Sequence, residues 1–145
     1  MTTNAHVVDA DLYHAAYERA FERTEYPGFL ARFTLEELKA HNGLVCYLTP
    51  DHKCGVAVYV EDAHVYALGL FNVGDIPGAG YSLFEAIVEK HHVTDLDAFE
   101  GVLTDLYVSL GFDTVEVVEF DPQYAHDWNY ERDGRPAVHF MRRQW

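Results

Sequence analysis

A short turn with two glycines is the first feature of this chain that could do chemistry. Gly78-Ala79-Gly80 stands between an apolar run at residues 68–73 and a helix-forming segment at residues 81–90. The first amides of a helix have no partner within the helix, and together with the helix dipole they bind anions, most often phosphate groups. The sequence therefore predicts either an anion site or a tight turn that needs glycine φ angles.

A tyrosine near the end of the next helix-forming segment is the second feature. Tyr107 shares one apolar helix face with Leu103, Leu106 and Leu110, and Gly111 can end this helix in a left-handed conformation. A phenol placed beside a leaving group can act as a general acid. The alternative is a core tyrosine beside an ordinary helix end.

The elements that must position these residues follow from periodicity and turn signals. Three alternating segments separated by short turns predict an antiparallel meander, and after it strands alternate with helices, which requires a crossover to a parallel neighbour. Two helices come first, one capped by Asp9 or Asp11 and one started by a capping box at Thr34. The predicted strands are residues 44–48, 55–60, 64–73, 96–99, 114–120 and 136–142, and the helices before the meander cover residues 9–23 and 34–41.

Length and charge exclude several classes of protein. The 145 residues suit one domain, residues 1–145, and 49% hydrophobic content argues against disorder. The net charge of −14 argues against duplex nucleic acid and anionic lipid as partners, and no run approaches the roughly 18 apolar residues of a membrane span. We expect a cytoplasmic protein with reduced thiols at Cys46 and Cys54, since no signal peptide precedes the domain.

The order of elements, the glycine turn and the tyrosine before Gly111-Phe112 together resemble the GNAT acyltransferase superfamily. The order matches across nearly the whole chain, and the motif residues cover about a third of it. The resemblance implies an α+β fold whose mostly antiparallel, twisted sheet of about six strands is flanked by helices. It also implies transfer of an acyl group from acetyl-CoA or another acyl-CoA, with Tyr107 protonating the departing thiolate.

In the family, the turn reads Gln or Arg, two residues, Gly, one residue, then Gly or Ala, and its amides hold the coenzyme A pyrophosphate. Gly78 and Gly80 match the last two positions, whereas Asp75 stands at the Gln/Arg position and Ile76 at a frequent glycine. The acidic side chain should weaken anion binding. The implied donors are the backbone amides of Gly78, Ala79, Gly80, Tyr81 and Ser82, with the Ser82 hydroxyl as an extra group.

Acyl transfer also needs a base, because an ammonium ion is not nucleophilic. The resemblance directs attention to Asp97 and Glu100, beside the expected acyl site. Asp97 could instead cap a helix from Phe99, and Glu100 could lie in its first turn. Either the Asn72 side chain or the Val73 amide could donate to the acyl carbonyl oxygen.

The nine histidines do not follow the spacing of known metal sites, so we expect no metal. A long aromatic loop at residues 121–135 either borders the acceptor site or folds back on the sheet.

These features favour an acyl-CoA-dependent N-acyltransferase for a cationic or polar amine of a small molecule or protein. The alternative is a catalytically inactive GNAT-like protein, such as a phage-type inhibitor, whose acidic surface binds a basic partner. Acyl transfer to a free nucleotide or nucleobase is a third hypothesis. The oligomeric state stays open, a homodimer included.

Overall fold

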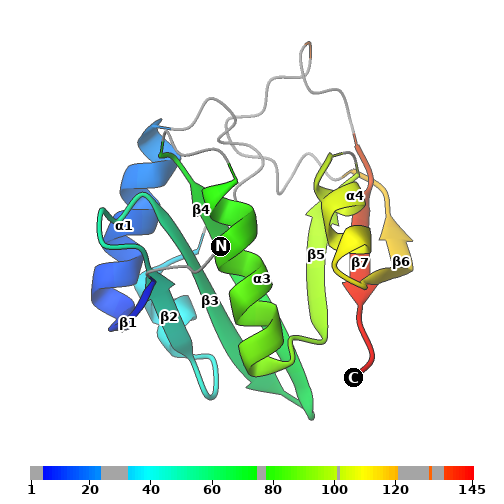
Figure 1. Cartoon of the computed structure of the whole chain (residues 1–145), viewed down its shortest axis with the longest axis horizontal. Helices are drawn as coiled ribbons and strands as arrows, with labels where there is room; N and C mark the ends of the chain where they lie inside the picture. Colours follow the sequence, from blue (N-terminus) through cyan, green and yellow to red (C-terminus); the bar gives the residue numbers. More distant parts are fainter. Residues whose placement is uncertain (1–4, 24–32, 75–77, 101, 121–130, 132–135) are drawn as a thin grey trace.

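One mixed sheet organises the molecule (Figure 1). The computed structural model describes residues 5–23, 33–74, 78–100, 102–120, 131 and 136–145. The strands, in the order β1-β2-β3-β4-β5-β7-β6, are β1 (His6–Val8), β2 (Val45–Leu48), β3 (Cys54–Glu61), β4 (His64–Asn72), β5 (Asp95–Phe99), β6 (Asp113–Val118) and β7 (Val138–Arg142). The helices are α1 (Ala10–Arg23), α2 (Leu35–Lys39), α3 (Ala79–His91) and α4 (Val102–Ser109).

The sheet confirms the predicted fold class. β2, β3 and β4 form the antiparallel meander, and the β4–β5 pair is the parallel one that the crossover through α3 requires. The sheet has seven strands rather than about six because β1, only three residues long, pairs with β2. So short a segment gives almost no periodicity to recognise.

Both early helices begin where the sequence predicts. The Asp9 carboxylate accepts a hydrogen bond of 2.8 Å from the Leu12 amide and so caps α1. Thr34 and Glu37 form the capping box of α2, each side chain accepting from the other's backbone amide. These caps satisfy amides that a helix start leaves without partners.

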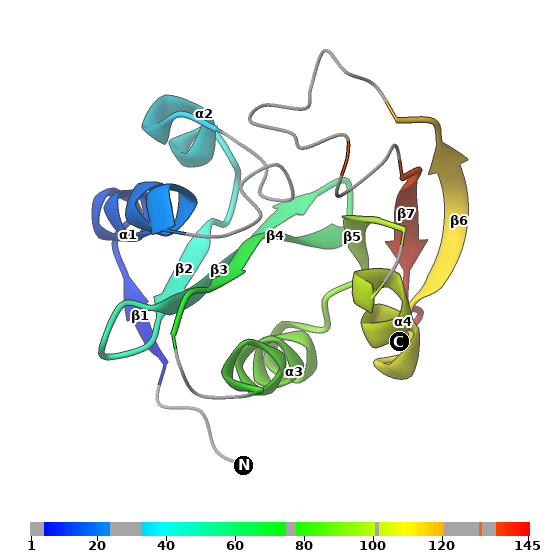
Figure 2. The same ribbon diagram turned by 90° about the horizontal axis from the view of Figure 1, so that it is seen from above.

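Two apolar clusters hold the helices to opposite faces of the sheet. α1 and α2 cover one face, whereas α3 and α4 cover the other (Figure 2). Tyr13 and Tyr17 of α1 and Leu38 of α2 are fully buried on the first face. Leu83, Phe84 and Val88 of α3 are fully buried on the second. Each such side chain contributes about 1.5–3 kcal/mol of burial free energy, so both helix layers are firmly anchored.

Cys46 and Cys54 belong to different clusters on opposite faces of the sheet. Both are buried free thiols, as the sequence predicts. Burial raises the pKa of Cys46 to about 11 and also raises the pKa of Cys54. Neither thiol is therefore set up as a nucleophile.

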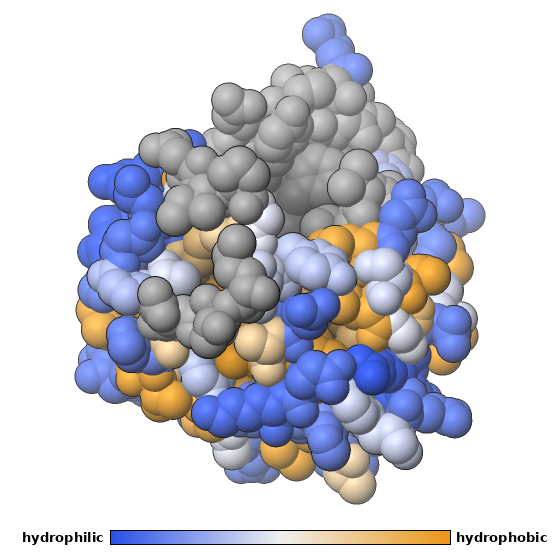
Figure 3. Space-filling view, in the orientation of Figure 1, coloured by the Kyte–Doolittle hydropathy of each residue, from blue (hydrophilic) through white to orange (hydrophobic). Residues whose placement is uncertain are grey.

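Apolar side chains are exposed at the edge of the sheet formed by β6 and on the neighbouring helix α4. Val108 on α4 and Val115 and Val117 on β6 are each more than half exposed. Figure 3 shows hydrophobic residues gathered on the α4 side of the molecule. None of the helices among the described residues has the length and apolar character needed to cross a membrane.

Candidate active site

β4 and β5 part from one another in the middle of the sheet. Within the described residues their register is confined to one pair, Tyr66 with Asp95, near the start of both strands. Figure 1 shows the two strands diverging toward their C-terminal ends. Backbone N–H and C=O groups in a sheet require partners. The facing edges beyond this pair can therefore receive an extended ligand that carries amide groups.

A bulge bends β4 beside this opening. Ala57 pairs with Leu68 and Gly55 with Phe71, so β4 has one more residue than β3 between these two pairs. Gly69 lies in the bulge with φ +66°, a left-handed value that glycine adopts without strain. A bulge leaves a residue outside the regular ladder, so N–H groups of the bulge can be directed at a ligand, whereas the Gly69 carbonyl oxygen already accepts from the Tyr13 hydroxyl. A glycine inside an apolar strand is a sequence signal for this feature, and the sequence analysis missed it.

The N-terminus of α3 has no side-chain cap. Gly78 occupies the N-cap position with φ +75°, and the first turn holds no acidic residue. The Ser82 amide donates a hydrogen bond of 2.9 Å to the Gly78 carbonyl oxygen, so this N–H already has a partner within the helix. The predicted backbone donors that remain are the amides of Gly78, Ala79, Gly80 and Tyr81.

The helix starts two residues earlier than predicted, and Gly80 explains why glycine is needed there. A Cβ atom at position 80 would lie 3.1 Å from Cβ of Asn72, so the end of β4 packs directly on the first turn of α3. The Asn72 side-chain oxygen accepts 3.0 Å hydrogen bonds from the Cys54 thiol and the Gly74 amide. Asn72 therefore joins β3, β4 and α3 where the anion would bind.

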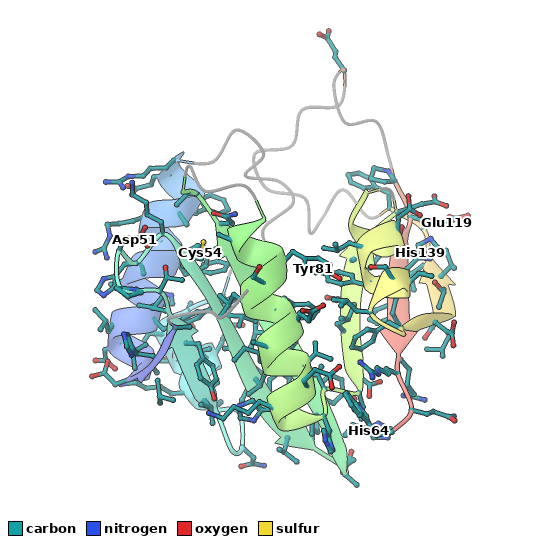
Figure 4. All side chains as sticks on the ribbon, viewed as in Figure 1. Asp51, Cys54, His64, Tyr81, Glu119 and His139 are labelled. Carbon is teal, nitrogen blue, oxygen red and sulfur yellow. The ribbon has the colours of Figure 1, made fainter. Side chains whose placement is uncertain are left out.

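The predicted role of Val73 meets a competing contact. Its amide donates 2.8 Å to the Lys53 carbonyl oxygen, so this N–H already has a partner in the sheet. Tyr81, by contrast, lies on the side of α3 that faces β5 (Figure 4).

Tyr107 lies between the two helices of its face. Its ring is 5.1 Å from that of Phe84 on α3 and shares a cluster with Leu96 and Ala98 of β5. Burial, assisted by the negative charge of Asp97, raises the pKa of Tyr107 to about 12. The phenol is therefore neutral and protonated at physiological pH, the state that a general acid needs.

Asp97 lies in the middle of β5, which overturns its alternative role as a helix cap. Its neighbours Leu96 and Ala98 are buried toward α3 and α4, so Asp97 points to the opposite face. Its side chain is open to solvent, yet the protein around it partly desolvates the carboxylate and raises its pKa. The charge of Asp97 also raises the pKa values of Tyr107 and Tyr59, so it acts on both faces of the opening.

Glu100 lies beyond the end of β5, whereas Asp97 lies within the strand. It follows β5, and its amide donates 2.8 Å to the Ala137 carbonyl oxygen, which fixes the end of β5 against the start of β7. Its exposed carboxylate lies 3.6 Å from Nε2 of His139. The geometry therefore favours Asp97 over Glu100 as the carboxylate at the opening.

Solved structures share this architecture. Ribosomal-protein-S18-alanine N-acetyltransferase from Escherichia coli is 16% identical over 94% of this chain and 90% of its own, with a TM-score of 0.64. An acetyltransferase of the GNAT family from Elizabethkingia anophelis, solved with acetyl-CoA bound, is 12% identical over 97% of both chains, with a TM-score of 0.60. This chain has the GNAT fold. No protein-family model and no curated protein sequence matches it.

The face of the opening opposite α3 carries a column of aromatic rings. On the face opposite α3, the rings of His41, Tyr59 and Tyr66 form a stacked column with centroid separations of 3.9 and 5.1 Å. Burial raises the pKa values of both tyrosines, and nearby carboxylates, Asp95 and Glu61 among them, raise them further. The sequence analysis did not identify this aromatic column, whose members are far apart along the chain.

Two parts of the expected GNAT site lie outside the described residues. They are Asp75 and Ile76 in the glycine turn, and the aromatic loop apart from Glu131. Their predicted roles stay predictions.

Proposed function

We propose that this protein is an acyl-CoA-dependent N-acyltransferase that acts on a cationic amine. The observation that carries the proposal is the arrangement around the parted strands. An uncapped helix N-terminus lies at one end of the opening, while a buried neutral tyrosine and a partly desolvated carboxylate flank it. The GNAT fold of solved N-acetyltransferases supports the same reading.

The acyl donor would span the opening. The amides from Gly78 to Tyr81 would bind its diphosphate, with the helix dipole supplying about half a positive charge. Its amide-bearing pantetheine arm would hydrogen-bond to the edges of β4 and β5 beyond their single pair. Asn72 touches Gly80, so its side chain would serve the diphosphate end. Backbone N–H groups at the Gly69 bulge would receive the acyl carbonyl oxygen.

The reaction needs one base and one acid. Asp97, directly or through water, would take a proton from the ammonium group of the acceptor. The neutral amine then attacks the thioester carbonyl carbon and forms a tetrahedral intermediate. As the carbon–sulfur bond breaks, Tyr107 would donate its proton to the departing sulfur, and the nitrogen of the intermediate would lose its second proton, which returns to the phenolate by way of water. The products are a neutral amide and free coenzyme A. The raised pKa of Asp97 makes its carboxylate a stronger base, and the raised pKa of Tyr107 keeps the phenol protonated, so that it has a proton to give.

The acceptor should carry a positive charge. Tyr59 and Tyr66 present stacked aromatic rings among the carboxylates of Glu61, Asp95 and Asp97 on the face opposite α3. Aromatic faces and carboxylates both attract ammonium groups. The net charge of −14 adds long-range attraction for a cation.

Isothermal titration with acetyl-CoA and coenzyme A tests the cofactor site. Gly78→Asp and Gly78→Asn form a matched pair, since both residues tolerate positive φ and nothing lies within 4 Å of a Cβ atom at this position. We expect micromolar binding by the wild type, weaker binding by both variants and at least about tenfold weaker binding by the aspartate than by the asparagine. Equal affinity of the two variants would mean that no anion binds here.

Turnover with a panel of amines tests the chemistry. Tyr107→Phe should lower kcat at least about a hundredfold while acetyl-CoA binding persists. An absence of coenzyme A binding by the wild type would overturn the enzyme proposal and leave the binding protein predicted as the alternative.

A further inference from the structure

The proposed cofactor site lacks a positively charged side chain within the glycine turn. The diphosphate of coenzyme A is anionic, the protein carries a net charge of −14, and Asp75 adds an acid to the glycine turn itself. No lysine or arginine occurs between Lys53 and Lys90, so the turn has no basic residue of its own. The backbone amides can bind an anion by themselves, but a basic side chain from elsewhere in the chain would strengthen binding at moderate salt.

The structure brings Lys53 to this turn. Lys53 immediately precedes β3, and its carbonyl oxygen accepts the 2.8 Å hydrogen bond from Val73, which fixes its backbone beside the end of β4. The Lys53 side chain lies along Gly74, with Cβ at 3.4 Å and Cδ at 3.7 Å from the position that a Cβ atom would take there. Its stem thus runs alongside the residue that leads into the glycine turn. Figure 4 shows the next residue, Cys54, beside α3.

The Lys53 ammonium group is also available. Among the described residues it has no carboxylate within 4.0 Å, whereas Lys39 is paired with Asp11 at 2.6 Å and Lys90 lies over the Tyr47 ring. Its nearest acid in sequence, Asp51, is close enough for the Lys53 charge to help lower the pKa of that carboxylate, but the direct hydrogen-bond donors to Asp51 are other groups. That carboxylate accepts hydrogen bonds of 3.0 Å from the Lys53 backbone amide and 2.8 Å from the Thr49 hydroxyl.

We propose that Lys53, supplied by the turn between β2 and β3, is the cation that binds the diphosphate of the acyl-CoA at the N-terminus of α3. It takes the place of the basic residue that the glycine turn lacks. This inference rests on the proposed function and deepens it by naming a binding residue outside the glycine turn. Twenty residues separate Lys53 from Val73 in sequence, and the β3–β4 pairing brings them together.

Calorimetric titration of Lys53→Gln, Lys53→Arg and Lys39→Gln with coenzyme A and dephospho-coenzyme A tests the inference. The Lys53→Gln variant should raise Kd about tenfold for both ligands, the loss expected for one charge-assisted hydrogen bond. Lys53→Arg should stay within about threefold of the wild type. Lys39→Gln removes the same charge from α2 and should leave Kd unchanged. Thermal melts establish that each variant is folded.

The outcomes separate this inference from the function on which it rests. Unchanged affinity of Lys53→Gln, with normal binding by the wild type, would overturn the role of Lys53 alone. An effect on coenzyme A that vanishes with dephospho-coenzyme A would place Lys53 at the 3′-phosphate and overturn its assignment to the diphosphate. Failure of the wild type to bind either ligand would overturn both proposals.

Discussion

The Tyr13 hydroxyl group donates a hydrogen bond of 2.5 Å to the carbonyl oxygen of Gly69, and this contact ties α1 to the bulge of β4. Tyr13 is fully buried, and burial raises the pKa of its phenol well above the ordinary value, so the hydroxyl stays a donor. A side chain at Gly69 would collide with the Tyr13 hydroxyl. The geometry of the bulge, and with it the proposed acyl site, thus depends on this helix.

Replacing Tyr13 by phenylalanine should destabilise the protein by about 1–3 kcal/mol, since the bulge carbonyl loses its buried donor. Urea unfolding measures the change. Tyr66→Phe is the matched control, because the Tyr66 hydroxyl makes no hydrogen bond with the described residues, and it should cost less than about 0.5 kcal/mol. Equal losses in the two variants would mean that the Tyr13–Gly69 bond contributes little.

The pH profile of turnover should lack an alkaline limb below about pH 10. A general acid must be protonated to act, and burial together with the charge of Asp97 raises the pKa of Tyr107 to about 12. Steady-state kcat measured from neutral to alkaline pH checks this. A fall in kcat centred below about pH 10, and absent from Tyr107→Phe, would show that the phenol is less desolvated in the working enzyme.

Asp97→Asn should separate activity from stability. The raised pKa means that the folded chain binds this proton more tightly than the unfolded chain. The carboxyl group therefore favours folding below its unfolded pKa, and that contribution is lost as the pH rises through the folded pKa. At pH 7 the asparagine variant should be at least as stable as the wild type, while kcat falls about a hundredfold. Thermal melts and turnover assays measure the two effects, and full activity in this variant would move the base elsewhere.

The sequence predicted most of the elements because their signals are local. Capping residues marked α1 and α2, and alternation marked the meander. The position of Asp97 in the sequence also carries a local signal. It stands between Leu96 and Ala98, and this alternation is typical of a strand with two faces, so a role as helix cap was the weaker interpretation.

The parts of the site that sequence reasoning missed depend on contacts between distant segments. Lys53 reaches Gly74 through the β3–β4 pairing, and the ring of Tyr59 meets Tyr66 the same way. The parting of β4 and β5 depends on a parallel register that no periodic pattern encodes. Such features arise from the register of the sheet, and a one-residue slip would move every side chain to the other face.

Acid should destabilise the fold at the closed end of the opening, where Asp95 is paired with Arg142. Asp95 is buried beside Tyr66, where Arg142 donates to its carboxylate at 2.9 and 3.0 Å and His64 contacts it at 2.9 Å. Burial alone would raise the pKa of Asp95, but these hydrogen bonds outweigh it and the net pKa is lowered. A lowered pKa stabilises the fold above the unfolded pKa, and that stability is lost as the pH falls through the folded value.

Arg142→Gln removes the main source of this effect and leaves a buried carboxylate with fewer donors. At pH 7 it should lower the free energy of unfolding, because the buried Asp95 carboxylate keeps its charge and loses its two guanidinium donors. The difference in unfolding free energy from the wild type should narrow as the pH falls through the lowered pKa of Asp95, because protonation removes the charge that Arg142 stabilises. Urea unfolding of both proteins across this range measures it. A difference that does not change with pH would show that Arg142 acts through packing of its side chain and not through the Asp95 charge.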